Sequence, residues 1–208
     1  MTVGSISPRP GDQRSLIAKS AAELFARRGY AATSMNEIAE ASRLSKPGLY
    51  HHFKDKAQVL LYIADGHVSR LVDIVTGVEA LDLAPEERLP ELIEAFMTEY
   101  AEAQNEHRVL TEDVRFLDPE AKARVLAKER TVVQVFADAI AATRPDLHDA
   151  QLHKLLTMFL FGMLNWMFTW FRPEGRFTYE QMAPIATQLF LNGISGLELT
   201  PKKKVRKA

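Results

Sequence analysis

Apolar residues recur every three or four positions along most of this chain, which is the spacing that lines one face of an α-helix. The strict alternation of a half-buried strand is not convincing in any segment. The pattern therefore predicts an all-α protein of about nine helices. They are expected near residues 12–28, 34–41, 45–51, 55–78, 86–104, 106–116, 120–143, 149–171 and 178–193.

Two of the expected helices are short and are separated by a tight turn. Ser34 with Glu37 three residues later forms a capping box, so a helix begins there. Ser45 followed by Pro47 is a second start signal, because a missing N–H costs little in a first helical turn. Helices this short must pack on a scaffold. An exposed second helix held in this way is the geometry that enters a DNA major groove.

The second short helix carries side chains suited to DNA. Lys46, His51 and His52 are expected on its exposed side, while Leu49 turns inward. Lysine and histidine donors suit the acceptors that guanine presents in the major groove. Gly48 leaves room for a close approach of the backbone. An ordinary solvated surface is the alternative for the polar side chains, and the start signals around them favour the DNA interpretation.

The segment that contains these helices resembles the N-terminal signature of the TetR family of transcriptional regulators. The matching positions are Ala21-Ala22-Glu23-Leu24-Phe25, Gly29-Tyr30, Thr33-Ser34, Ile38-Ala39, Ala41 and Gly48-Leu49-Tyr50-His51-His52-Phe53, with Lys56. The resemblance covers about residues 12–71. It implies a helix-turn-helix head, palindromic operator DNA as a partner, a homodimer and a small-molecule effector bound in a helical body.

The resemblance also implies roles for single residues. Tyr50 would place its hydroxyl on a phosphate, Thr33 and Lys56 would clamp phosphates, and the last two long helices would form a four-helix dimer interface. The complete expected DNA-binding set is Thr33, Ser34, Asn36, Arg43, Ser45, Lys46, Pro47, Gly48, Tyr50, His51, His52 and Lys56.

Charge divides the chain in the same place as the helix pattern. Residues 1–60 carry nine Lys/Arg against five Asp/Glu, whereas residues 61–200 carry twelve against twenty-two. A basic head on an acidic body suits a DNA contact confined to the head. We therefore expect four regions. They are a flexible arm at 1–11, a DNA-binding domain at 12–60, a ligand-binding and dimerisation domain at 61–197, and a basic tail at 198–208.

The sequence offers little for catalysis. It contains no cysteine, no Gly-rich phosphate loop and no His-Glu-x-x-His pair. The adjacent His51 and His52 point to different sides of a helix and make a poor metal pair. We expect no enzymatic activity, no catalytic residue, no metal and no cofactor. Since no apolar run reaches 18 residues and the N-terminus lacks the apolar core of a signal peptide, the expected location is the cytoplasm.

The body is large enough for a sensing cavity, which favours a ligand-responsive regulator over a bare DNA-binding module. Residues 166–176 resemble regulators of fatty-acid, aromatic-acid and steroid breakdown, which implies a repressor released by an acyl-CoA or a related CoA thioester. Arg172 and Arg176, with Arg115, are candidates for its pyrophosphate. A repressor of an efflux pump that senses hydrophobic drugs or free fatty acids is the alternative. The residues expected to line the cavity are Met97, Tyr100, Arg115, Phe116, Met163, Trp166, Met167 and Trp170. For each of them the alternative is an ordinary place in the core.

Overall fold

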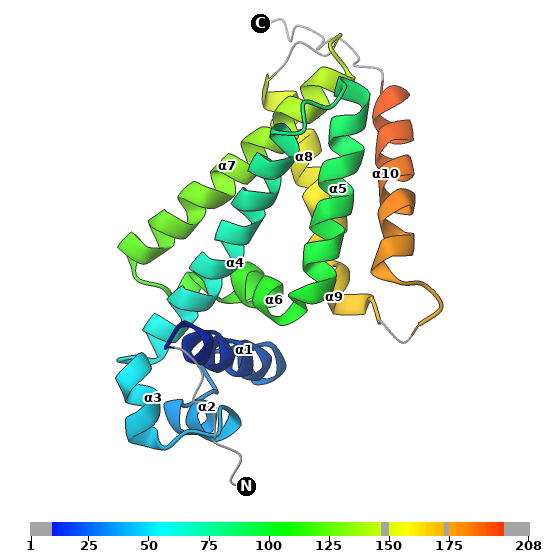
Figure 1. Cartoon of the computed structure of the whole chain (residues 1–208). Helices are drawn as coiled ribbons and strands as arrows, with labels where there is room; N and C mark the ends of the chain where they lie inside the picture. Colours follow the sequence, from blue (N-terminus) through cyan, green and yellow to red (C-terminus); the bar gives the residue numbers. More distant parts are fainter. Residues whose placement is uncertain (1–9, 147–149, 173–174, 198–208) are drawn as a thin grey trace, which may run out of the picture.

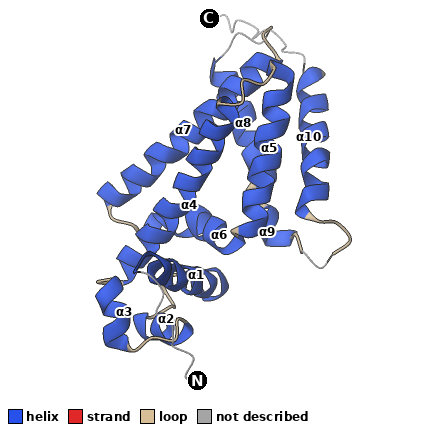
Figure 2. Ribbon diagram, in the orientation of Figure 1, coloured by secondary structure: helices blue, strands red, loops and turns tan. Residues whose placement is uncertain are grey.

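The computed structural model describes residues 10–146, 150–172 and 175–197, and within these ranges the regular structure is entirely helical (Figure 2). The all-α prediction is thereby confirmed. The elements are α1 (Pro10–Arg28), α2 (Met35–Ala41), α3 (Lys46–His52), α4 (Lys56–Glu79), α5 (Pro85–Glu102), α6 (Gln104–Asp113), the 3₁₀ turn η1 (Val114–Phe116), α7 (Pro119–Thr143), α8 (Ala150–Leu164), α9 (Met167–Trp170) and α10 (Tyr179–Ser195).

The first three helices form a small head at one end of the molecule (Figure 1). Phe25 of α1, Ile38 of α2 and Leu49 of α3 are buried together with Phe53, which follows α3. Neither α2 nor α3 is longer than two turns, so this shared apolar core is what stabilises them. The core thereby presents the outer side of α3 to solvent.

The remaining helices form the body, and α4 runs from the head into it (Figure 1). On the body side α4 packs against α5, α6 and α7, while α8 packs on α7 and α10 packs on α5. The short α6 also lies against α1 of the head. The head therefore meets the body through α4, which is continuous with it, and through contacts with α6 and with Phe116 of η1.

The boundaries differ from the expected ones at three places. The helix expected at 149–171 is broken after Leu164, and α9 resumes at Met167. The helix expected at 106–116 ends as α6 and continues as the tighter turn η1. α1 begins at Pro10, inside the expected arm, while residues 1–9 and 198–208 lie outside the described part, so the arm and the tail stay predictions. No helix in the described ranges is both long enough and apolar enough to cross a membrane.

Candidate nucleic-acid interface and effector cavity

Side-chain caps fix both short helices of the head. Ser34 Oγ accepts a hydrogen bond from the Glu37 backbone N–H at 3.3 Å, and Glu37 Oε2 accepts one from the Ser34 N–H at 2.8 Å. These bonds to Ser34, together with the nearby Arg28, hold the pKa of Glu37 below its usual range. Ser45 Oγ likewise accepts from the Gly48 N–H at 3.2 Å. The predicted start signals are therefore the groups that position α3.

The turn between α2 and α3 contains a left-handed residue that is not glycine. Arg43 has φ 54°, and its backbone N–H donates to the Glu40 carbonyl at 3.0 Å. The next residue, Leu44, is half-buried and donates to the Ala39 carbonyl at 2.9 Å. The turn is thus closed by backbone hydrogen bonds while the Arg43 side chain remains exposed.

Most of the predicted DNA-binding residues lie on the outer surface of the head. Lys46, Pro47, Tyr50 and His51 are exposed on α3, with Tyr50 showing 44% of its surface. The His52 ring is half-buried and meets the His51 ring edge-on. The other exposed members of the predicted set are Ser34, Asn36, Arg43 and Ser45. Figure 1 shows α3 at the outer end of the head, where a duplex can approach it.

Thr33 and Lys56, which were expected to contact phosphates, make hydrogen bonds within the protein. Thr33 is 2% exposed, and its hydroxyl donates to the Gly29 carbonyl at 3.0 Å. The Lys56 ammonium donates to the backbone carbonyls of Tyr30 at 2.7 Å, Ala31 at 3.3 Å and Thr33 at 2.6 Å. All three of its donors are used, so Lys56 ties the start of α4 to the loop between α1 and α2.

A cavity of about 150 Å³ lies inside the body among α4, α5, α6, α7 and α8. Its apolar wall includes Val68, Leu71, Phe96, Val132 and Phe161, and its polar lining includes Tyr100, His107, Glu129 and Asn165. A cavity of this size and character accepts a group about as large as benzene.

The polar groups of this cavity are strongly affected by burial. Tyr100 donates its hydroxyl to Asn165 Oδ1 at 2.8 Å, and burial raises the pKa of this phenol. The His107 ring stacks on the Tyr100 ring at 3.8 Å, and burial, followed by the neighbouring His67, lowers the pKa of His107 to about 3. Burial also raises the pKa of Glu129, which Arg130 opposes. The cavity therefore contains a neutral imidazole and a carboxyl group inclined to hold its proton.

A line of hydrogen-bonding groups leads from the cavity toward the head. His107 Nδ1 lies 3.3 Å from Nε2 of His67, which is fully buried in the middle of α4. On its other side, His67 Nδ1 lies 3.1 Å from Arg70 Nη2 and 3.2 Å from Glu99 Oε1. Arg70 Nε donates to the same Glu99 oxygen at 2.7 Å.

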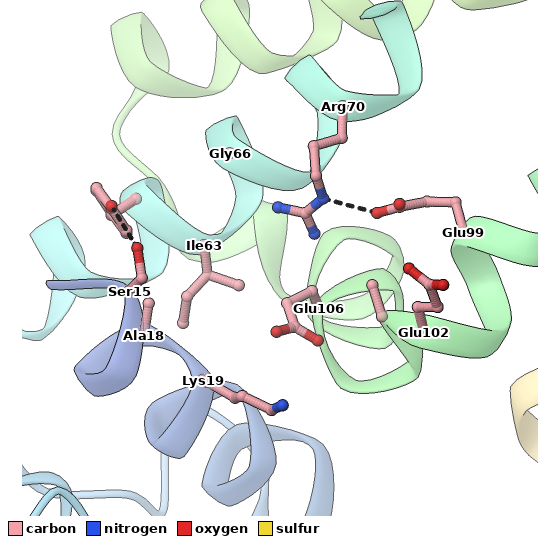
Figure 3. A pocket seen from close by; sticks show the side chains of 11 residues that line it. Ser15, Ala18, Lys19, Ile63, Gly66, Arg70, Glu99, Glu102 and Glu106 are labelled. Atoms are coloured by element: carbon pink, nitrogen blue, oxygen red, sulfur yellow. Dashed lines mark hydrogen bonds and ion pairs between the residues drawn. The ribbon is translucent and has the colours of Figure 1, made fainter. Parts of the chain in front are cut away.

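Arg70 and Glu99 form part of the wall of a second, larger cleft of about 400 Å³ between head and body. Figure 3 shows Ser15 and Lys19 of α1 on one side and Glu102 and Glu106 of the body on the other. The cleft thus collects residues from α1, α4, α5 and α6 at the place where the head meets the body.

Large apolar side chains remain exposed along α8, α9 and α10. Leu189 of α10 is 66% exposed, and the others are Leu155, Met158, Phe159, Met163, Trp166, Trp170 and Ile185. Exposed apolar surface of this kind commonly marks a protein interface.

Comparison with known families identifies the fold and the head together. Residues 17–63 match the family model described as bacterial regulatory proteins of the tetR family, and residues 82–194 match that of the tetracyclin repressor-like C-terminal domain. The chain belongs to the TetR family. The resemblance seen in the sequence is confirmed, and the protein is a DNA-binding transcriptional regulator of the TetR family, whose members are regulators and not enzymes.

Individual TetR-family relatives have different regulatory roles. The transcriptional activator FasR of Mycolicibacterium smegmatis is 30% identical over 138 residues, which cover 66% of this chain and 63% of FasR. The transcriptional repressor KstR2 of the same species is 24% identical over 197 residues, 90% of this chain and 93% of KstR2. The structure of AibR in complex with isovaleryl coenzyme A and operator DNA aligns with a TM-score of 0.74 and 28% identity, over 85% of this chain and 97% of AibR.

The eight residues expected to line a TetR-type effector cavity do not gather there. Only Tyr100 lines the 150 Å³ cavity; Met97 and Met167 are buried elsewhere in the core. Phe116 stacks on Tyr30 of the head at 5.1 Å, and the Arg115 guanidinium lies over the Phe116 ring. The remaining residues, Met163, Trp166 and Trp170, are exposed. They lie around the break after Leu164, on a side of α8 and α9 against which no other described helix of the chain packs.

Sequence reasoning missed most of the groups that do line the cavity. His107, Glu129 and Asn165, which line it, and His67, which lies behind His107, were not among the expected residues. A histidine at an apolar helical position was the signal available for His67. The other residues come together from α6, α7 and the end of α8, and no local pattern of the sequence indicates such a meeting.

Proposed function

We propose that this chain is a homodimeric, operator-binding repressor that an acyl-CoA thioester with a small acyl group releases from DNA. The observation that carries the proposal is the partly open cavity whose lining includes residues of α4 and α6, two helices that contact the head. An occupant of this cavity touches two of the helices through which the body contacts the head.

The dimensions of the cavity favour a small acyl group. The volume of about 150 Å³ is well below the range of about 300–1,000 Å³ that is typical of sites for drug-sized ligands. AibR, whose complex contains isovaleryl coenzyme A, supports a short branched acyl group as the first candidate. The aliphatic and aromatic wall suits such a group.

The nucleotide part of a CoA ligand must lie outside this cavity. The lining contains the Glu129 carboxyl group and no Lys or Arg, so it does not suit a pyrophosphate. Arg115, Arg172 and Arg176 are exposed and remain the candidates for that contact. The proposed ligand therefore buries its acyl end and leaves its charged end at the surface.

The proposed dimer uses the exposed apolar side chains of α8 and α10. α8 packs on α7 and α10 packs on α5, and the two helices touch each other. A two-fold pair formed through them presents two heads to a palindromic operator, with the two α3 helices about 34–36 Å apart in successive major grooves. Effector binding would favour a form in which this spacing is wrong.

The test is a release assay on the full chain. Duplex DNA selected by the protein from a random pool is labelled, and its fluorescence anisotropy is followed as isovaleryl-CoA, free isovalerate or free CoA is added. We expect release by the thioester at micromolar concentration and none by either fragment. Near-complete release, from 99:1 bound to 1:99, requires about 5.5 kcal/mol of preference for the released form.

Glu129 supports a second candidate, an efflux regulator that binds a hydrophobic cation. An acidic group in a cavity whose wall is largely apolar can pair with a drug ammonium. The same assay with cationic dyes separates the two candidates. Release by the dyes and not by thioesters would establish the efflux function, and Glu129→Gln should then abolish the response.

A further inference from the structure

We propose that His107 is the polar anchor for the effector's carbonyl oxygen, and that His67 links this hydrogen bond to the Arg70–Glu99 pair at the cleft between head and body. The proposal rests on the effector function proposed above. Its geometric basis, a directed chain of hydrogen bonds through two buried imidazoles, can be tested without any ligand.

A guanidinium carries only donors and a carboxylate only acceptors, so His67 Nδ1 either accepts from Arg70 or donates to Glu99, and the proposed chain takes the first polarity. Arg70 Nη2 lies 3.1 Å from His67 Nδ1, and Arg70 Nε donates to Glu99 Oε1 at 2.7 Å. His67 Nδ1 also lies 3.2 Å from Glu99 Oε1, and a hydrogen bond with His67 helps to lower the pKa of Glu99. The opposite polarity, in which His67 Nδ1–H donates to Glu99, is therefore the alternative that the tautomers decide. In the proposed polarity Nδ1 of His67 is unprotonated and the proton is on Nε2.

The second imidazole continues the same direction. His67 Nε2–H points to His107 Nδ1 at 3.3 Å, so His107 Nδ1 accepts. A neutral His107 must therefore carry its proton on Nε2. Burial is the main cause that keeps this ring neutral, and its pKa lies near 3. The chain runs from Arg70 through His67 to a donor on His107.

This last donor is left for an occupant of the cavity. His107 lines the cavity, and its Nε2 is buried without a hydrogen-bond partner among the described residues. A hydrogen-bonding interaction with the Asn165 backbone carbonyl raises the pKa of His107, so this carbonyl is the internal acceptor that a ligand must replace, although it makes no hydrogen bond of normal geometry to Nε2. Because an unpaired buried N–H is costly, the site selects a ligand that brings an acceptor.

Two other donors of the cavity lining are already engaged. The Tyr100 hydroxyl donates to Asn165 Oδ1 at 2.8 Å, and the Thr111 hydroxyl donates to the His107 backbone carbonyl at 2.9 Å. The Asn165 side-chain amide and a protonated Glu129 are further donors of the lining. We assign the thioester carbonyl to His107 because its Nε2 is buried and lacks a partner, while the acyl chain meets the apolar wall. The selected chemical feature is a carbonyl oxygen next to a small apolar group.

The other end of the chain lies where the body meets the head. Arg70 joins α4 to Glu99 of α5, and both residues line the cleft opposite Ser15 and Lys19 of α1 (Figure 3). An acceptor at His107 strengthens each hydrogen bond behind it, because the bonds share one direction. The ligand thereby fixes Arg70 between α4 and α5 at the surface that faces α1.

The first test reads the tautomers directly. Nitrogen-15 NMR of the full ligand-free chain, with labelled histidine and with His67→Phe and His107→Phe spectra for assignment, reports which ring nitrogen carries the proton. We expect Nε2–H and unprotonated Nδ1 in both rings. A proton on Nδ1 of either ring would overturn the chain of hydrogen bonds, whatever the effector proves to be.

The second test asks whether His107 recognises the carbonyl. Direct titration compares isovaleryl-CoA with S-isopentyl-CoA, in which a methylene replaces the thioester carbonyl. Wild-type protein should prefer the thioester about 10-fold. His107→Gln, which keeps a donor near the Nε2 position, should retain most of this preference, and His107→Asn, which does not reach that position, should lose it. Equal affinity of wild-type protein for both compounds would refute the anchor.

The third test concerns His67 and separates the chain from general packing. His67→Phe should reduce the preference for the thioester to about threefold or less, because His107 is then free to carry its proton on either nitrogen. Phe168→Leu is the matched control, since Phe168 meets the His107 ring edge-on at 6.0 Å and makes no hydrogen bond to it. A preference unchanged in His67→Phe, or lost equally in Phe168→Leu, would contradict the role of His67.

The outcomes also distinguish this inference from the proposed function. If wild-type protein binds neither compound, the CoA function has failed, and the tautomers still decide whether the chain of hydrogen bonds exists. If it binds both equally and is released from DNA, the function stands and the anchor has failed.

Discussion

The head and the body of this protein organise their polar groups in opposite ways. In the head, the side chains that cap the short helices bond to backbone groups three residues away, as Ser34 does with Glu37 and Ser45 with Gly48. In the body, the decisive polar contacts join residues far apart, such as His67 to His107 and Tyr100 to Asn165. The head is thereby rigid and exposed, whereas the body holds its polar groups in a buried network that an occupant can influence.

The largest expected effect tests whether the rigidity of the head depends on one lysine. Lys56→Ala removes three hydrogen bonds to loop carbonyls, and we expect it to lower the free energy of unfolding by about 3 kcal/mol, since bonds to charged groups contribute about 1.5–3 kcal/mol each and are not additive. Urea denaturation measures this loss. The exposed neighbour Lys54→Ala is the control.

DNA titrations of the same variants sharpen the result. Loss of DNA affinity together with stability supports a structural role for Lys56. Unchanged stability, with a salt dependence of binding that is shallower by about one unit, would instead identify Lys56 as a direct phosphate contact.

The next effect concerns the exposed apolar side of the body. Leu189→Asp should raise the dissociation constant of the proposed dimer at least about 30-fold, because it places a charge where that interface would bury a leucine side chain worth about 2 kcal/mol. Sedimentation velocity measures the change. Leu81→Asp is a matched control, since Leu81 is similarly exposed at 57% but lies between α4 and α5. Equal weakening by both variants, or by neither, would remove α10 from the interface.

Base recognition by α3 should produce effects of intermediate size. Lys46→Ala and His51→Ala should each cost about 1–3 kcal/mol at particular base pairs of the operator if these side chains read base edges. Tyr50→Phe should weaken binding to all sequences, since a phosphate contact carries no base preference. Gel-shift titration against single-base operator variants distinguishes the two patterns. A uniform loss for Lys46 would place it on the phosphate backbone.

The smallest effect tests the buried charge nearest the boundary between head and body. Burial, with Glu112, raises the pKa of Asp113 to about 6, above its usual value of 3.8. The folded state therefore favours the protonated carboxyl group, and this contribution to stability is lost as the pH rises from about 4 through 6.

Asp113→Asn removes that pH dependence. We expect the variant to be more stable than wild type by about 1 kcal/mol at pH 8, less than the two-unit rise alone would give, because solvent screens part of it. The advantage should disappear at pH 4. Urea midpoints at both pH values provide the check, and a variant less stable than wild type at pH 8 would show that the carboxylate has a favourable partner.

The difference between head and body also explains what sequence could predict. The caps at Ser34 and Ser45 act within three residues, so the short helices and their boundaries were readable. The break after Leu164 was not readable, because Asn165 and Tyr100, 65 residues apart in sequence, meet at this point only in the folded body. The internal role of Lys56 was hidden in the same way, since the same side chain can bind a phosphate or three carbonyls.

The cavity shows the same limit. Aromatic and methionine residues near the end of α8 predicted an apolar site, yet their helical positions place Met163, Trp166 and Trp170 at the surface. The actual lining is decided by how five helices pack. Periodicity identifies which residues are apolar, and packing decides which of them face a cavity and which face solvent.

The left-handed Arg43 has a consequence for how the head can change over generations. A side chain in this backbone region costs about 1–2 kcal/mol, and glycine would relieve that cost. Replacing Arg43 with glycine should therefore raise the free energy of unfolding of the head, and it would remove a cation beside α3. A variant library sorted for heat resistance alone should enrich this change, and one sorted for promoter control should discard it. The first selection would show how much heat resistance the protein gains when glycine replaces Arg43. The second would show how much promoter control it loses.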